Sequence, residues 1–335
     1  MLSYTSMTIA QLCLVIPYYI VNSKSLVFVF LAYLISGVGI GTFESNLISC
    51  LTPLGPTTKS WAVIGIPVGF NMISVGSFIL FSIWPDVVEL QAAVYLFIVA
   101  ANIAGLLFYI YLVPNIEFEA SSDTMYTFLK DLKCWREWFP TIWKHCVALM
   151  IDMCCVSIFS AVALYIFDAA EVPIVPRSTT TIPKNAFDAI YYCFSFMGDF
   201  TSRKIAYRDK PRNPFFFLVL SCIGVALVLS KTAVVAPLGM FCVMFANGSI
   251  YAQTTKFVDV SVPKKYNLMA LSVWLFIGDI GSFCGSQAIQ PLRTIVGPVL
   301  EAPAAPPQAL PTNTTVTTTG SSMRNLAEIP QATLF

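Results

Sequence analysis

The chain has 335 residues, of which 57% are hydrophobic and only 11% are charged, whereas an ordinary soluble domain carries about 25% charged residues. So few charges cannot cover the surface of a water-soluble protein of this length, and the mean hydropathy of +0.75 points the same way. The net charge of only +1 leaves no strong overall field that would attract a nucleic acid.

Nine apolar stretches, each bounded by turn residues or charges, are candidates to cross a bilayer, which takes about 20 apolar residues in a helix. We interpret them all as helices, because an open sheet edge cannot be satisfied in hydrocarbon. The sequence thus predicts an all-α polytopic membrane protein, with four spans in residues 1–114 and five in residues 143–290. The stretches cover about residues 3–22, 26–48, 61–84, 91–113, 143–167, 186–202, 215–230, 232–251 and 268–290.

Residues 115–142 connect the two sets of spans and contain an apolar stripe at helical spacing. The cations of this segment, Lys130, Lys133 and Arg136, keep off the stripe. This pattern predicts an amphipathic helix at the cytoplasmic interface, and a helix packed beneath the bundle is the alternative. The stripe consists of Met125, Phe128, Leu129, Leu132, Trp135, Phe139 and Ile142.

The last segment, residues 291–335, is rich in proline, alanine and threonine and has almost no charged or aromatic residues beyond its start. It cannot bury enough surface to fold, so we expect a disordered tail. Within it, Asn313-Thr314-Thr315 is an acceptor for N-linked glycosylation.

The lysines and arginines predict the orientation of the chain in the membrane. Thirteen of the 19 fall on one set of alternate loops, which the positive-inside rule places in the cytoplasm. The N-terminus is then cytoplasmic, and the C-terminus is extracellular or luminal. The acceptor at Asn313 agrees, because glycosylation takes place on that second side of the membrane.

The chain lacks the residue patterns that support catalysis or metal binding. Nine of its ten cysteines fall in apolar stretches, no Cys-x-x-Cys pair occurs, and His145 is the single histidine. We find no paired carboxylates, metal-ligand cluster or activated nucleophile. The sequence therefore predicts neither an enzyme nor a bound metal or cofactor.

Ionisable residues inside predicted spans are costly, so they are the first candidates for a functional site. Asp199 and Arg203 lie four residues apart on one helix face, where they can neutralise each other. They are either an ion pair at a helix end or a pair that binds a polar solute or acts as a latch. Glu44 has no basic partner in its own span, which predicts a solute-binding group, a proton carrier or a structural contact with a neighbouring helix. The remaining carboxylates of this kind are Asp152, Asp188 and Asp279.

Several short motifs of this chain resemble, in the same order, motifs of the equilibrative nucleoside transporter family. The most specific are Asp199-Phe200-Thr201-Ser202-Arg203, which resembles the Asp-x-x-x-Arg signature of the family's eighth helix, and the Phe-x-Asn-Gly sequence at residues 245–248. The others lie at residues 41–47, 64–69, 111–118, 262–265 and 278–281.

The resemblance implies a major-facilitator-like helical bundle with a central solute cavity, which moves nucleosides or nucleobases by alternating access. Transport could be facilitative or linked to protons, because the family often has glutamine where Glu44 stands. The implied solute-binding residues are Glu44, Tyr192, Asp199, Arg203, Asn247 and Asp279. The family has six spans before its cytoplasmic loop, whereas this chain has four, so the first two helices are expected to be missing.

Two alternatives remain open. A battenin-like lysosomal membrane protein shares a pattern of small residues within the spans, such as Gly37, Gly39 and Gly41 here, and a Ser-Arg near the same helix end. A truncated paralogue that does not transport would explain the missing helices. The nucleoside transporter interpretation favours the plasma membrane over an endolysosomal one.

Overall fold

The computed structural model describes residues 2–23, 25–51, 55–84, 88–112, 125–208 and 212–297. The predicted disorder of the tail beyond residue 297 and the glycosylation acceptor at Asn313 lie outside the described residues.

The first helical group contains four helices, α1 to α4. A five-residue π-helical turn, Ile16–Ile20, extends α1, and Pro17 within that turn has no backbone N–H to donate. The helices are α1 (Leu2–Val15), α2 (Leu26–Leu51), α3 (Pro56–Ile83) and α4 (Val88–Leu112).

The second helical group contains the five long helices α6 to α10, preceded by the short helix α5 (Met125–Lys133). A two-stranded antiparallel hairpin, β1 (Glu171–Pro173) and β2 (Thr181–Pro183), joins α6 to α7, with Val172 opposite Ile182. The long helices are α6 (Trp135–Ile166), α7 (Lys184–Ala206), α8 (Phe215–Leu229), α9 (Ala236–Ser261) and α10 (Asn267–Val296).

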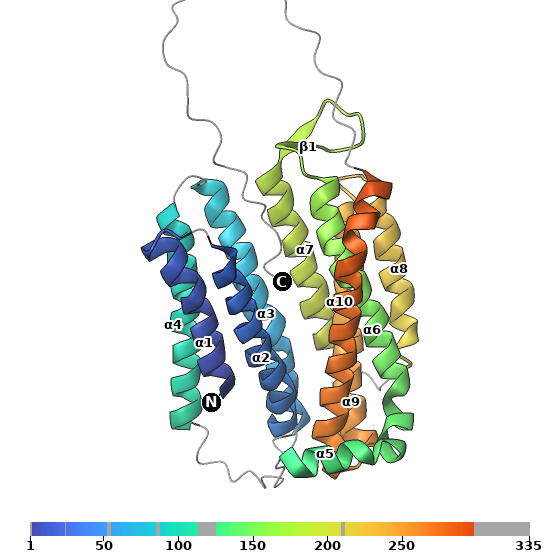
Figure 1. The fold of residues 1–335 in the computed structure, drawn as a ribbon. Helices are drawn as coiled ribbons and strands as arrows, with labels where there is room; N and C mark the ends of the chain where they lie inside the picture. The colour runs from blue at the N-terminus through green and yellow to red at the C-terminus, as the bar shows by residue number, and fades with distance from the viewer. Residues whose placement is uncertain are drawn as a thin grey trace, which may run out of the picture.

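Figure 1 shows the two helical groups side by side, with α3 against α7 and α2 against α10 at the boundary between them. The helix α5 lies across the lower end of the second group, at the end of the molecule where α1 begins. We call this the α5 end. The β1–β2 hairpin caps the opposite end (Figure 1).

The helices confirm an all-α protein built of apolar helices, and each predicted stretch overlaps one helix. In the described parts of the chain, five helices are long and apolar enough to cross a membrane, namely α2, α3, α4, α6 and α10. The apolar helix α8 has only 15 residues. The helices α7 and α9 bury many polar side chains, which lower their hydropathy. Nine membrane crossings therefore remain a prediction.

The outer surface of both groups is apolar. Large side chains on α2, α3, α4, α8 and α10 point outward and are between 64% and 72% exposed. A protein surrounded by water seldom exposes so much apolar surface, whereas a bilayer favours it. The examples are Phe30, Trp61, Phe108, Phe216, Phe276 and Phe283.

The predicted amphipathic segment consists of two helices rather than one. The chain turns at Cys134, so that Trp135 already belongs to α6. Leu129 and Leu132 on α5 are exposed, whereas Ile142 in α6 is fully buried in the core of the second group. The stripe therefore divides between α5, where it is exposed, and α6, where it passes from the exposed Trp135 to the buried Ile142.

Glycines allow α6 and α10 to pack closely. A Cβ atom built on Gly281 would overlap the backbone carbonyl of Met150, and one on Gly285 would lie 2.6 Å from the carbonyl oxygen of Cys154. Neither position can hold a larger side chain unless the two helices separate.

We expect Gly281→Ala to lower the free energy of unfolding by about 1–3 kcal/mol, because the added methyl overpacks the contact with α6. Gly37→Ala on α2 is the matched control, since a Cβ there meets nothing within 4 Å. Thermal unfolding of the detergent-solubilised chain measures both. Equal midpoints for the two variants would contradict this account of the α6–α10 contact.

Candidate functional site

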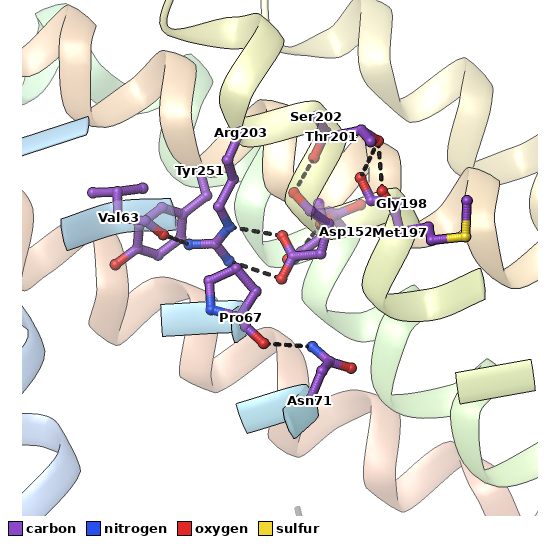
Figure 2. Close-up of polar contacts among 12 residues, drawn as sticks. Val63, Pro67, Asn71, Asp152, Met197, Gly198, Thr201, Ser202, Arg203 and Tyr251 are labelled. Carbon is purple, nitrogen blue, oxygen red and sulfur yellow. Dashed lines mark hydrogen bonds and ion pairs between the residues drawn. The ribbon is translucent and has the colours of Figure 1, made fainter. Parts of the chain in front are cut away.

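A proline in α3 leaves one backbone carbonyl of that helix without its usual donor, and this carbonyl accepts a hydrogen bond from Arg203 of the second helical group. Pro67 lies inside α3 and has no N–H, so the carbonyl of Val63, four residues earlier, loses its helical partner. In a bilayer that carbonyl must find another donor. The Arg203 Nη1 atom donates to it over 3.2 Å (Figure 2).

Arg203 also binds Asp199, as the spacing predicted. Its Nε donates to Asp199 Oδ1 over 2.7 Å and its Nη2 to Asp199 Oδ2 over 3.3 Å. The guanidinium lies over the ring of Tyr251 on α9, 4.4 Å from the centroid. Both charged side chains are buried and Arg203 lies in the last turn of α7, so the pair is a buried ion pair at a helix end. Arg203 thus contacts α7, α3 and α9 together.

Glu44 joins the same cluster from α2. The Tyr251 hydroxyl donates a hydrogen bond to Glu44 Oε1, so Glu44 has the contact with a neighbouring helix that was one of its predicted roles. The structure therefore brings Glu44, Asp199 and Arg203 together through Tyr251. Sequence reasoning missed Tyr251, although it lies one helical turn after Asn247 of the Phe-x-Asn-Gly motif.

The amide of Asn247 binds a buried carboxylate. Its Nδ2 donates to Asp152 Oδ2 over 2.7 Å, and Ser221 Oγ donates to Asp152 Oδ1 over 2.9 Å. Asp152 is completely buried, and these two bonds tie α6, α8 and α9 to one another. In this arrangement Asn247 and Asp152 stabilise the second helical group.

The two remaining predicted residues lie outside the cluster around Arg203. Tyr192 is buried on α7 two turns before Asp199, in an apolar cluster with Phe187 and Val243. Asp279 is exposed on α10, within electrostatic range of Glu44. Tyr192 nevertheless belongs to a row of buried polar side chains at i, i+3 and i+4 spacings. We call this row the polar face of α7; it contains Asp188, Tyr192, Ser195, Asp199 and Arg203.

A second ion pair, in which only the lysine is fully buried, joins the helical groups near the α5 end. Lys59 Nζ donates to both carboxylate oxygens of Asp259 over 2.7 and 2.6 Å, and Asn267 Nδ2 donates to Asp259 Oδ1 over 3.0 Å. The sequence predicts that Lys59 lies in the loop before the stretch at residues 61–84, where it is one of the 13 cations on the cytoplasmic side. It lies instead in the first turn of α3, 1% exposed, so that α3, α9 and α10 meet around it.

Three polar links between described residues cross the boundary between the groups: Arg203 to the Val63 carbonyl, Tyr251 to Glu44, and Lys59 to Asp259. The last of these lies where α3 begins and α9 ends, at the α5 end in Figure 1. Apolar contacts cross the boundary at the same place, because Ile48 and Val63 of the first group belong to the buried apolar cluster of the second group. The polar links and these apolar contacts together hold this end of the boundary closed.

We expect Pro67→Ala to be coupled energetically to Arg203→Lys. The alanine restores an N–H that competes for the Val63 carbonyl, and the lysine lacks Nη1. A double-mutant cycle on thermal unfolding should give a coupling of about 0.5–3 kcal/mol. Pro140→Ala inside α6 is the control, and its cycle with Arg203→Lys should be additive. Additivity in the Pro67 cycle as well would contradict the role of Pro67.

Within the described ranges, no group of three or more histidine, cysteine, aspartate or glutamate side chains could hold a metal ion. His145 is buried, hydrogen-bonds Thr254 through Nδ1 over 2.9 Å, and stacks on Phe257. It therefore has a packing role between α6 and α9.

No protein-family model and no curated protein matches this chain. The resemblance to the equilibrative nucleoside transporters consequently rests on the motifs in the sequence.

Proposed function

We propose that the chain is a membrane transporter that moves nucleosides or nucleobases by alternating access. The observation that carries the proposal is the buried polar cluster at the boundary of the two helical groups, where Arg203 of one group binds the Val63 carbonyl of the other. Buried charges are rare in membrane-spanning bundles and usually face a solute path. The family motifs of the sequence supply the solute class.

In this proposal about nine helices span the membrane in a major-facilitator-like arrangement, and the two groups rock about a site near the midplane. The polar face of α7 lines the solute path. Asp199 and Arg203 engage ribose hydroxyls, and Glu44 faces the base or a proton. Each of these three residues already has a protein partner, so the solute would replace some of their contacts as the groups move.

The proposal also includes an orientation. The positive-inside rule puts the α5 end in the cytoplasm, together with the N-terminus, and the tail on the extracellular or luminal side. The location of α5 and of the start of α1 at one end supports this orientation (Figure 1). The link of Lys59 to Asp259 would then close the cytoplasmic side, and the plasma membrane is the proposed location.

Uptake by a purine-auxotrophic host without its own nucleoside uptake tests the proposal. The host expresses the full chain and receives a panel of labelled nucleosides and nucleobases at two pH values. We expect saturable uptake and growth on at least one compound, and faster uptake at the more acidic external pH if transport is linked to protons. A protein that reaches the membrane but supports no uptake of any compound contradicts the proposal and favours the battenin-like or non-transporting alternatives.

A further inference from the structure

One buried acceptor at the boundary between the helical groups has no hydrogen bond. Asn71 follows Val63 and Pro67 at i+8 and i+4 along α3, and it is only 2% exposed. Its Nδ2 donates to the Pro67 carbonyl over 2.9 Å (Figure 2). Its Oδ1 has no hydrogen-bond partner among the described residues.

The orientation of this amide follows from its partner. A backbone carbonyl accepts hydrogen bonds and cannot donate, so the atom of Asn71 that lies against the Pro67 carbonyl must be the nitrogen. The unsatisfied atom is therefore the oxygen, which is an acceptor. A buried acceptor without a donor costs free energy, and any molecule that brings a donor to it recovers that cost.

The position of Asn71 indicates which molecule could do so. Val63, two turns earlier on α3, already contacts Arg203 of the polar face of α7. The two helices run in opposite directions and pack together along this boundary (Figure 1). Asn71 therefore lies two turns farther along the same boundary, away from the α5 end. On the proposed function, a solute between the groups would pass this position.

We propose that Asn71 Oδ1 accepts a hydrogen bond from the transported solute, either from a base N–H or from a ribose hydroxyl, and so determines which solutes are carried. This inference rests on the proposed transport function. Binding sites built to hydrogen-bond a group discriminate strongly against analogues that lack it, because the buried acceptor then stays unsatisfied. The Pro67 carbonyl acts as a positioning group, since it holds the amide nitrogen and directs the oxygen away.

Counterflow into proteoliposomes that contain the full chain tests the proposal with three pairs of probes. Adenosine is compared with N6,N6-dimethyladenosine, uridine with N3-methyluridine, and uridine with 3′-deoxyuridine, each pair differing in a donor. We expect the wild-type chain to prefer the donor-bearing member of at least one pair by about tenfold. The pair that responds distinguishes a base N–H from a ribose hydroxyl.

Variants then distinguish a solute-binding role of Asn71 from a purely structural one. Asn71→Leu should bring the ratio of the two transport rates in the preferred pair close to one. Asn71→Gln, which keeps both the amide nitrogen and the acceptor oxygen, should retain a preference for the donor-bearing member. Asn46→Leu is the matched control, because Asn46 also donates to the carbonyl four residues earlier, over 2.6 Å, but is exposed on α2. It should leave the ratio unchanged.

Three results would overturn the assignment of Asn71: an unchanged ratio in Asn71→Leu, a lost ratio in a folded Asn71→Gln, or wild-type transport that discriminates within none of the pairs. If the wild-type chain carries neither these probes nor any other nucleoside or nucleobase of the uptake panel, the proposed function itself fails.

Discussion

Replacing Asp199 by alanine is expected to abolish nucleoside uptake and to lower the free energy of unfolding by about 3–5 kcal/mol. The reason is the burial of its partner, because Arg203 would keep its full charge without the carboxylate that accepts two of its hydrogen bonds. Removing one partner of a buried ion pair is far more costly than removing one from a solvated pair. Uptake per molecule at the cell surface and thermal unfolding in detergent measure the two effects.

The chain offers a matched control in the ion pair of Asp168 and Lys184, near the β1–β2 hairpin. The side chains of these residues are 66% and 27% exposed, so Asp168→Ala should cost no more than about 1 kcal/mol and leave uptake unchanged. Asp199→Asn, which keeps the shape of the side chain, should also lose uptake. Normal uptake in Asp199→Asn would remove the pair from the solute site, and equal stability losses at Asp168 and Asp199 would contradict the account of burial.

The second large effect concerns the pair of Lys59 and Asp259. We expect the loss of unfolding free energy to differ strongly between substitutions of the two partners. Lys59 is 1% exposed, whereas Asp259 is 21% exposed and retains the hydrogen bond from Asn267. Asp259→Ala therefore strands a deeply buried ammonium group and should cost about 3–5 kcal/mol. Lys59→Met fills the same space without a charge, and it should cost clearly less.

Unfolding midpoints of the two single variants and of the double variant test this asymmetry. The double variant Lys59→Met/Asp259→Ala should be more stable than Asp259→Ala alone, because the stranded charge is gone. If Lys59→Met lowers the unfolding midpoint more than Asp259→Ala does, the burial of the Lys59 charge is not what makes Asp259→Ala destabilising. Both single variants should also alter uptake, since each weakens the closed α5 end.

The apolar helices were predictable because a bilayer demands long apolar segments, whereas the polar part of α9 was not. The predicted eighth stretch ended at residue 251, but α9 continues to Ser261. The residues in between include Gln253, Thr254 and Thr255, whose polarity is typical of a loop in a hydropathy profile. All three are buried against neighbouring helices, which the local sequence does not reveal.

The site was predictable in part for a related reason. The pair of Asp199 and Arg203 is local, at four residues' separation, so helix geometry alone brings the two side chains together. The contacts of Arg203 with Val63 and of Tyr251 with Glu44 span 140 and 207 residues of sequence. Their existence depends on how the two helical groups pack. Pro67 was the one local signal, because it marks a carbonyl without a helical donor.

The most direct test of alternating access is a distance measurement across the α5 end. Spin labels at Trp61→Cys on α3 and Val260→Cys on α9 flank the link of Lys59 and Asp259, and both native side chains are well exposed. Pulsed electron–electron double resonance on the full chain in liposomes, with the native cysteines replaced, gives the distribution of distances between the two labels. We predict a shorter and a longer distance. Adding adenosine or uridine should change the fraction of molecules at each distance, and Asp259→Ala should increase the fraction at the longer one. A single distance that neither solute nor the substitution changes would contradict alternating access about this boundary.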